Sequence, residues 1–228
     1  MLTGCFYMFT VCILQPIESS RKRSPLVTRS QEAQHGRLWA ADRRKQLLHV
    51  AASLLAEEGV DGVRIPDVAT LAGVTRPVVY KHFSNRQDIL VGILEDFGLT
   101  LQNRVQASLG TEPEKLDLQA ALKAVIEATC DVLEERGAGA WNLLSSTGTD
   151  PVLDEVARRV RGEILEPWVP KIGEVTGLKG PALRSLSQMT AACARTNLSM
   201  WLEGEWSRRQ AVKTLIRATT ALLKEFTR

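Results

Sequence analysis

The stretch VTRPVVYKHFSNRQDIL, from Val74 to Leu90, decides how the rest of the chain is interpreted. It begins like a helix, with Thr75 at a capping position and Pro77 near the first turn, where proline is tolerated. Aromatic, imidazole and cationic side chains follow within a few residues, at Tyr80, Lys81, His82 and Arg86. Polar and charged side chains are found mostly at surfaces, so this segment is expected to be exposed and to contact a partner.

A longer amphipathic helix is expected before this stretch. In RRKQLLHVAASLLAEEG, residues 43–59, apolar side chains recur with the 3.6-residue period of a helix. They form one stripe, made of Leu47, Leu48, Ala51, Leu54 and Leu55. Gly59 follows the stripe and is expected to end the helix, because glycine is common just after a helix C-terminus.

A second, short helix is expected in IPDVATLAG, residues 65–73. Val68, Ala69 and Leu71 are expected to point inward, and Gly73 to end the helix. The turn AGVT then leads into the helix of the opening stretch, so the pair has the form of a helix-turn-helix. In that motif the second helix enters the DNA major groove with its N-terminal residues leading.

The start of this second helix carries residue types that read base edges. Arg76 can donate to guanine O6 and N7 or to a phosphate, and Pro77 or Val78 can contact a thymine methyl group. Val79 and Phe83 lie four residues apart and are expected to pack inward. The alternative is a tight helical hairpin whose polar face is merely solvated.

The side chains that follow suit phosphate oxygens. Tyr80 and His82 can donate hydrogen bonds, and Lys81 adds positive charge. Arg86 stands at the start of the next helix, whose N-terminus itself favours an anion. Contacts of this kind position a protein on the duplex without reading its sequence.

Residues 43–90 resemble the DNA-binding domain of the TetR/AcrR family of bacterial transcriptional regulators. The resemblance rests on the Leu-rich first helix ending in E-x-G, on DVATLAGVT, and on Y-x-H-F followed by a basic and an acidic residue. It implies a phosphate contact at Arg86 and DNA-facing positions at Thr75, Arg76, Pro77, Val78, Tyr80, Lys81 and His82. The family usually caps its second helix with Ser or Thr. This chain has Arg64 there, which makes a weaker cap and offers its charge to a phosphate instead.

Beyond the opening stretch the sequence carries helical patterns and no strand-period alternation of useful length. Helices are expected from Asn85, from Asp117, around Trp141, from Pro151 with a kink or break at Pro167 and Pro170, from Pro181 to Gly204, and from a Ser207–Gln210 capping box to near Phe226. The sequence therefore predicts an all-α fold.

Three regions are expected along the chain. Residues 1–36 are expected to be an N-terminal extension that is either disordered or included because the start codon was assigned too far upstream. Residues 37–92 are expected to be the helix-turn-helix DNA-binding domain. Residues 93–228 form a larger helical domain, to which the resemblance assigns ligand binding and dimerisation.

The composition is ordinary for a soluble globular protein, with 44% hydrophobic and 24% charged residues and a formal net charge of +3. The N-terminal run MLTGCFYMFTVCIL has the length of a signal peptide, but it lacks the preceding positive charge and is too short to span a bilayer. Arg21, Lys22 and Arg23 after it could serve as a DNA-contacting arm. No membrane partner is expected.

Cysteines and histidines give little support to metal or enzyme chemistry. The cysteines are far apart in the sequence, at Cys5, Cys12, Cys130 and Cys193. Neither a zinc site nor a disulfide framework is therefore expected, and a reducing cytoplasm fits. The histidines lie in or before the DNA-binding unit, at His35, His49 and His82. With no glycine-rich phosphate loop and no G-x-S-x-G motif either, we expect no enzyme, no metal and no cofactor.

The resemblance places a ligand cavity among the C-terminal helices. The candidate ligand contacts are Phe97, Leu101, Glu127, Cys130, Trp141, Asn142, Trp168, Met189, Cys193 and Asn197. Most are apolar, which suits an apolar or aromatic ligand held by few polar groups, although each can equally be ordinary core. Glu127 differs, because a carboxylate on the apolar stretch AVIEATC needs a partner if it is buried.

Apolar stripes on the last two long helices predict a dimer interface of four helices, two from each subunit. The candidate interface residues are Leu186, Met200, Trp201, Leu215 and Leu222. Part of each stripe must also serve the core of the single chain.

The predicted function is that of a cytoplasmic transcriptional regulator that binds a palindromic operator as a homodimer, since one short helix reads too few base pairs alone. The resemblance implies a repressor that a small, largely apolar effector releases. The alternatives are a ligand-independent architectural DNA-binding protein and a helical protein-interaction module. A ligand-dependent rise in melting temperature would separate the regulator from both.

Overall fold

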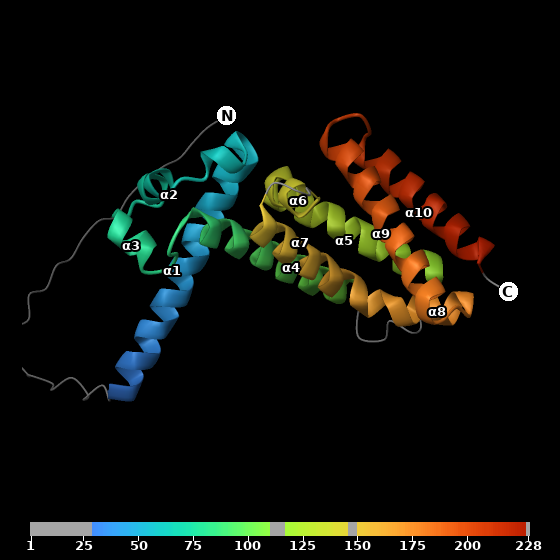
Figure 1. The fold of residues 1–228 in the computed structure, drawn as a ribbon, viewed down its shortest axis with the longest axis horizontal. Helices are drawn as coiled ribbons and strands as arrows, with labels where there is room; N and C mark the ends of the chain where they lie inside the picture. The colour runs from blue at the N-terminus through green and yellow to red at the C-terminus, as the bar shows by residue number, and fades with distance from the viewer. Residues whose placement is uncertain (1–28, 110–116, 146–149, 227–228) are drawn as a thin grey trace, which may run out of the picture. The chain divides into compact units, whose positions relative to one another are not determined.

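The computed structural model describes residues 29–109, 117–145 and 150–226, with side chains from Asp42 onward. Within these ranges every regular element is a helix, which confirms the all-α prediction (Figure 1). Ala40–Arg228 forms one compact unit, and the residues up to Trp39 are grouped separately. Of the predicted extension, only the helical backbone from Arg29 belongs to the described part of the chain.

The first elements are α1 (Arg29–Glu58), the 3-10 turn η1 (Val60–Gly62), α2 (Ile65–Leu71) and α3 (Arg76–Tyr80). The predicted stripe of α1 is buried, and Val68 and Ala69 of α2 join the same core. Leu71, expected to point inward, is instead 62% exposed. Ala72 takes the inward position, because residues three and four apart share one face of a helix and Leu71 lies off that face.

The turn between α2 and α3 depends on Gly73, whose φ of 65° lies in the left-handed region that favours glycine. The N–H of Val74 donates to the carbonyl oxygen of Ala69 at 2.9 Å and closes the end of α2. Val79 and Phe83 are buried, as predicted. They hold α3 to the core through one side and leave its opposite side exposed.

The remaining elements are α4 (Arg86–Leu109), α5 (Leu118–Arg136), α6 (Ala138–Ser145), α7 (Pro151–Leu165), η3 (Glu166–Trp168), α8 (Val169–Thr176), α9 (Gly180–Leu202) and α10 (Arg208–Glu225). Several ends lie where the sequence predicts them. Asp117 caps α5 by accepting from the Ala120 N–H at 2.7 Å. The α-helix ends before Pro167, which lies in η3, whereas Pro170 lies in the first turn of α8 and does not interrupt that helix. Ser207 and Gln210 form the capping box of α10.

The start of α4 is fixed by a reciprocal pair of hydrogen bonds. Asn85 accepts from the N–H of Asp88 at 2.9 Å, and the Asp88 carboxylate accepts from the N–H of Ser84, also at 2.9 Å. The second bond lowers the pKa of Asp88. The start of α4, at Arg86 within the opening stretch, is thus encoded locally.

The helices after α3 pack against one another, both as neighbours in the chain and in sequence-distant pairs. Helix α4 contacts α5, α6 and α7, while α9 pairs with α10, and α10 also contacts α5 (Figure 1). One apolar core runs from Leu47 in α1 through α4 to Leu215 in α10, and a smaller cluster joins α8, α9 and α10. None of the helices in the described ranges is long and apolar enough to cross a membrane.

Candidate DNA-binding surface and ligand cavity

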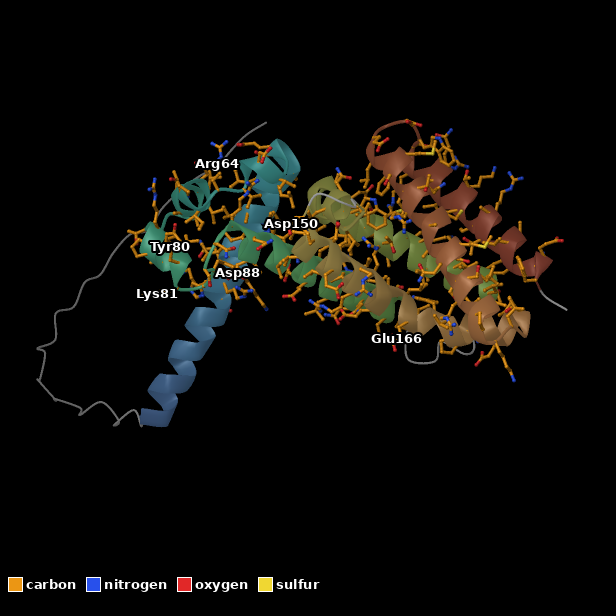
Figure 2. The ribbon with its side chains drawn as sticks, viewed as in Figure 1. Arg64, Tyr80, Lys81, Asp88, Asp150 and Glu166 are labelled. Atoms are coloured by element: carbon orange, nitrogen blue, oxygen red, sulfur yellow. The ribbon has the colours of Figure 1, made fainter. Side chains whose placement is uncertain are left out.

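Helix α3 buries Val79 and presents most of its other side chains to solvent. The exposed residues here are Thr75, Arg76, Pro77, Tyr80 and Lys81, and Val78 is half-buried. The Tyr80 side chain is 56% exposed, and Figure 2 shows Tyr80 and Lys81 at the C-terminal end of α3. These side chains gain little from the protein's own core, so they remain available to a partner.

His82 lies at the end of α3 and is half-buried among cations. Its carbonyl oxygen accepts from Nη1 of Arg44 at 3.0 Å, and the Arg44 guanidinium lies 4.3 Å from the centre of the Phe83 ring. Burial, followed by the charges of Arg44, Arg43 and Lys81, lowers the pKa of His82 below its ordinary value. The imidazole is therefore neutral near pH 7 and has one N–H to donate.

Arg86 and Arg64, the two arginines expected to meet phosphates from outside α3, both bind the η1 turn. Nη2 of Arg86 donates to the carbonyl oxygen of Val60 and forms an ion pair with Asp61 at 3.1 Å. Arg64 makes no side-chain cap for α2, and its Nε donates to the carbonyl oxygen of Asp61 at 3.1 Å. An exposed carboxylate therefore stands beside Arg86, where a phosphate would have to approach.

The first turn of α4 is tied to α7 through Asp150, which is labelled in Figure 2. Nε2 of Gln87 donates to both oxygens of the Asp150 carboxylate, at 2.9 and 2.8 Å. The same carboxylate caps α7 by accepting from the N–H groups of Val152 and Leu153. Burial works to raise the pKa of Asp150, but the bonds from Leu153, Val152 and Gln87 lower it below its ordinary value. The carboxylate is thus charged near neutral pH and serves two helices at once.

Helices α4 and α7 stay in close contact beyond this point. Arg159 of α7 forms an ion pair with Glu95 of α4 at 2.6 Å. A Cβ atom added to Gly98 would lie 2.6 Å from Cγ1 of Val160, so the two helices can approach this closely only with glycine here. A displacement of α7 would therefore be transmitted to α4 by packing as well as by polar contacts.

A cavity of about 640 Å³ lies among the helices from α4 to α10. Its wall is mainly apolar and includes Leu101, Leu122, Ile126, Trp141, Ile164 and Trp168. The indole of Trp141 donates to Oγ of Ser199 at 3.1 Å, which pairs its polar atom and joins α6 to α9. The volume lies within the range of cavities that hold small organic ligands.

Leu101, Trp141 and Trp168 are the predicted ligand residues that line this cavity. The other predicted positions lie elsewhere. Phe97 and Asn197 are buried away from the cavity wall, Asn142 and Met189 are exposed, and Cys193 packs against the core. Helical periodicity marks a face as inward, but it does not tell a cavity wall from a contact with a neighbouring helix.

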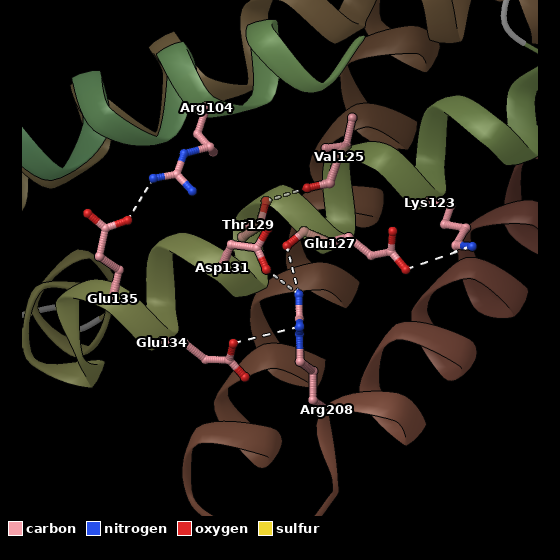
Figure 3. A network of polar contacts seen from close by, with 9 residues as sticks. All are labelled: Arg104, Lys123, Val125, Glu127, Thr129, Asp131, Glu134, Glu135 and Arg208. Atoms are coloured by element: carbon pink, nitrogen blue, oxygen red, sulfur yellow. Dashed lines mark hydrogen bonds and ion pairs between the residues drawn. The ribbon is translucent and has the colours of Figure 1, made fainter. Parts of the chain in front are cut away.

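Glu127 and Cys130 belong to the contact between α5 and α10. The Glu127 carboxylate is partly exposed and lies 3.9 Å from Lys123, while its carbonyl oxygen accepts from Arg208 (Figure 3). Arg208 also binds Asp131 of α5. Burial raises the pKa of Cys130 to about 11, so its thiol is protonated and unreactive near neutral pH.

The predicted dimer residues divide into two kinds. Leu186 and Leu215 are buried in the chain's own core, so their side chains offer little surface to a second copy. Met200, Trp201 and Leu222 are partly exposed on α9 and α10. These three are the predicted positions that keep surface for a partner.

Cations on the cavity wall were not predicted from the sequence. Arg158, Arg161, Lys171 and Arg195 line the cavity. A signal was present for two of them: Arg161 lies four residues after the buried Ala157, and Arg195 stands in the small-residue run AACARTN. A basic residue on an apolar helical face is a departure from the amphipathic pattern that can be recognised before the structure is known.

An exposed helix-turn-helix followed by helices that enclose a mainly apolar cavity is typical of DNA-binding transcriptional regulators. Residues 47–93 match the family profile described as bacterial regulatory proteins, tetR family. The HTH-type transcriptional activator FasR of Mycolicibacterium smegmatis is 31% identical over 171 residues, which cover 74% of this chain and 76% of FasR. The chain therefore belongs to the TetR family.

Other relatives agree with this membership. The HTH-type transcriptional repressor KstR2 of Mycolicibacterium smegmatis is 31% identical over 98 residues, 43% of this chain and 46% of that protein. A tetR-family transcriptional regulator from Streptomyces coelicolor matches 80% of each chain with a TM-score of 0.67 and 25% identity. The chain is thus a DNA-binding transcriptional regulator, and its relatives include an activator and a repressor by name.

Proposed function

We propose that the chain is a ligand-responsive repressor that binds a palindromic operator as a homodimer and is released by a small, largely apolar effector. The observation that carries this proposal is the position of α4. The helix begins directly after the exposed α3 and reaches the cavity wall at Leu101. A single rigid element thus connects a DNA-reading surface with a space for a ligand.

In this proposal α3 is the recognition helix. Arg76, Pro77 and Val78 lead it into the major groove, where Arg76 reads a guanine and the other two contact a thymine methyl group. Tyr80, Lys81 and the neutral His82 contact phosphates. The exposure of α3 and the cations that surround His82 support this arrangement.

Homodimerisation is proposed through α9 and α10. The two helices pair with each other, and Met200, Trp201 and Leu222 keep partly exposed apolar surface. A two-fold axis there would place two copies of α3 on successive turns of a palindromic site. Each copy alone reads too few base pairs to be selective.

Release follows from the contacts of α7. The cavity is lined by Arg161 and Ile164 of α7, and the same helix is capped by Asp150, which binds Gln87 at the start of α4. A ligand that displaces α7 would move α4 and change the separation of the two recognition helices in the dimer. Coupling of this kind is typically about 1–3 kcal/mol, which lowers DNA affinity roughly 5- to 150-fold.

The test begins with a duplex selected from a randomised pool by the purified protein. A palindromic consensus and a dimer mass by light scattering at micromolar concentration are expected. Apolar and aromatic metabolites are then screened for a rise in melting temperature. Each hit should weaken binding to the selected duplex. Hits that bind without affecting DNA would favour a ligand-independent DNA-binding protein, and a monomer that binds the duplex tightly would exclude the dimer.

The direction of the response is tested separately. The relative FasR is named an activator, whereas KstR2 is named a repressor. Transcription from a promoter that contains the selected duplex should fall when the protein is added and recover with the ligand. A rise in transcription on adding the protein would assign the chain to the activators instead.

A further inference from the structure

The charged side chains on the cavity wall are all of one sign. Arg158, Arg161, Lys171 and Arg195 are cationic, and no Asp or Glu is among the described residues that line the cavity. Neutral polar groups are few beside the leucines, isoleucines and tryptophans of the wall. Such a surface favours a ligand that is apolar over most of its length and negatively charged at one group.

Two of the four cations have carboxylate partners close by. Arg158 forms an ion pair with Glu155 at 2.5 Å, and Lys171 lies 3.3 Å from Glu174. In contrast, no carboxylate in the described ranges lies within ion-pair distance, 4.0 Å, of Arg161 or Arg195. These two guanidinium groups are therefore the ones with capacity to bind an anion.

Arg161 is held in place and feels a second positive charge. It is half-buried, and its Nη1 donates to the carbonyl oxygen of Leu144. Burial and the charge of Arg195 lower the pKa of Arg161, while Asp154 acts against them through its own charge. Two like charges near each other in a partly desolvated site are unfavourable, and an anion placed between them removes that cost.

We propose that the cavity binds an amphipathic carboxylate, with its hydrocarbon body against the apolar wall and its acid group between Arg161 and Arg195. The planar guanidinium fork matches a carboxylate with two parallel hydrogen bonds. Leu122, Ile126 and Ile164 supply apolar wall for the body. This inference rests on the proposed function in taking the cavity as the effector site, and it adds the chemical class of the effector.

The first test compares ligands that share one hydrocarbon body. Decanoate, decanamide and decylammonium are titrated into the full-length protein by calorimetry at pH 7.5, below the concentrations at which they aggregate. Decanoate should bind about 10- to 100-fold more tightly than decanamide, because hydrogen bonds to a charged group are stronger. Each added methylene should tighten binding roughly fourfold until the cavity is filled. Equal affinities for decanoate and decanamide would overturn the proposal.

The second test assigns the head group to the two arginines. Arg161→Gln and Arg195→Gln should each reduce the preference for decanoate over decanamide at least severalfold, while decanamide affinity stays within about twofold. Retained decanamide binding shows that the variant cavity is folded. Arg184→Gln is the matched control, because Arg184 is exposed on the same helix as Arg195 and does not line the cavity. Arg195→Lys should keep part of the preference for decanoate. An undiminished preference in both glutamine variants would contradict the assignment.

Failure of this inference and failure of the proposed function give different results. If decanoate binds with the expected preference but leaves affinity for the selected duplex unchanged, the carboxylate site is supported and the proposed release from DNA is contradicted. If neutral molecules bind and release the duplex while decanoate does not bind, the proposed release is supported and the carboxylate site is contradicted.

Discussion

Gln87 and Asp150 are joined by two hydrogen bonds, from Nε2 of the amide to both oxygens of the carboxylate, at 2.9 and 2.8 Å. Gln87 lies in the first turn of α4, which follows the proposed recognition helix α3, and Asp150 is the N-cap of α7. Because α7 also lines the cavity through Arg161, this contact connects the proposed DNA-reading surface with the proposed ligand site.

Replacing Gln87 by alanine should weaken the coupling between ligand and DNA and leave each affinity, measured alone, close to that of the native protein. The Asp150 cap remains, so α7 keeps its fold. We expect the coupling free energy to fall by about 0.5–2 kcal/mol, measured as the change in operator Kd on saturation with ligand. Gln106→Ala, an exposed glutamine on the same helix, is the control. Native coupling in Gln87→Ala would make the contact purely structural.

Asp61 should oppose DNA binding through its ion pair with Arg86. In Asp61→Asn, Arg86 loses its ionic partner but keeps its bond to the carbonyl oxygen of Val60, and a charge that repels phosphate is removed, so affinity for all duplexes should rise. Arg86→Ala should instead weaken binding to all sequences and reduce the salt-dependence slope by about 0.9. Both are read from Kd against salt concentration. If Asp61→Asn weakens binding as Arg86→Ala does, the pair serves only to fix the start of α4.

Replacing Arg76 or Lys81 by alanine should weaken DNA binding in two different ways. Loss of a bidentate guanine contact in Arg76→Ala should cost about 1–3 kcal/mol at one operator position and relax the base preference there. Lys81→Ala should weaken binding uniformly and lower the salt slope by about 0.9. Binding to a set of single-base operator variants distinguishes the two. An unchanged base preference in Arg76→Ala would place that residue on the backbone instead.

DNA binding should become tighter as pH falls below about 6.5, the ordinary pKa of histidine. In the free protein, burial and neighbouring cations lower the pKa of His82, so its protonation is disfavoured. A phosphate beside the imidazole raises that pKa again, and binding therefore takes up a proton. His82→Gln should remove this pH dependence, whereas His49→Gln on exposed α1 surface should keep it. Operator Kd measured from pH 5.5 to 8 decides the matter.

The sequence predicted the fold because its local signals agree. The stripe of α1, the capping groups at Asp117 and Ser207 and the break at Pro167 all depend on neighbours within a few residues. Leu71 shows the limit of such reasoning. It was predicted to be buried, but the neighbouring Ala72 is buried and Leu71 is exposed. Helical periodicity predicts which residues point inward more reliably in the middle of a helix than at its ends.

The candidate sites were less predictable because they depend on contacts between distant residues. The pairing of Arg86 with Asp61 and of Gln87 with Asp150 joins helices whose relative position no local pattern encodes. The cavity wall is similar: it needs the packing of α4 to α10 before Leu101 and Trp168 can be separated from ordinary core residues. Arg161 was missed although its position, four residues after the buried Ala157, places a cation on the inward face of α7.

The most direct test of the account is reciprocity between ligand and operator. A ligand that raises the melting temperature is titrated by calorimetry into the free protein and into the protein saturated with its selected duplex. If the ligand weakens DNA binding through α4 and α7, the duplex must weaken ligand binding by the same factor, roughly 5- to 150-fold. We predict that increase in ligand Kd for the native protein and a smaller one for Gln87→Ala. An identical ligand Kd with and without the duplex would contradict the coupling, and with it the proposal that this regulator senses the ligand.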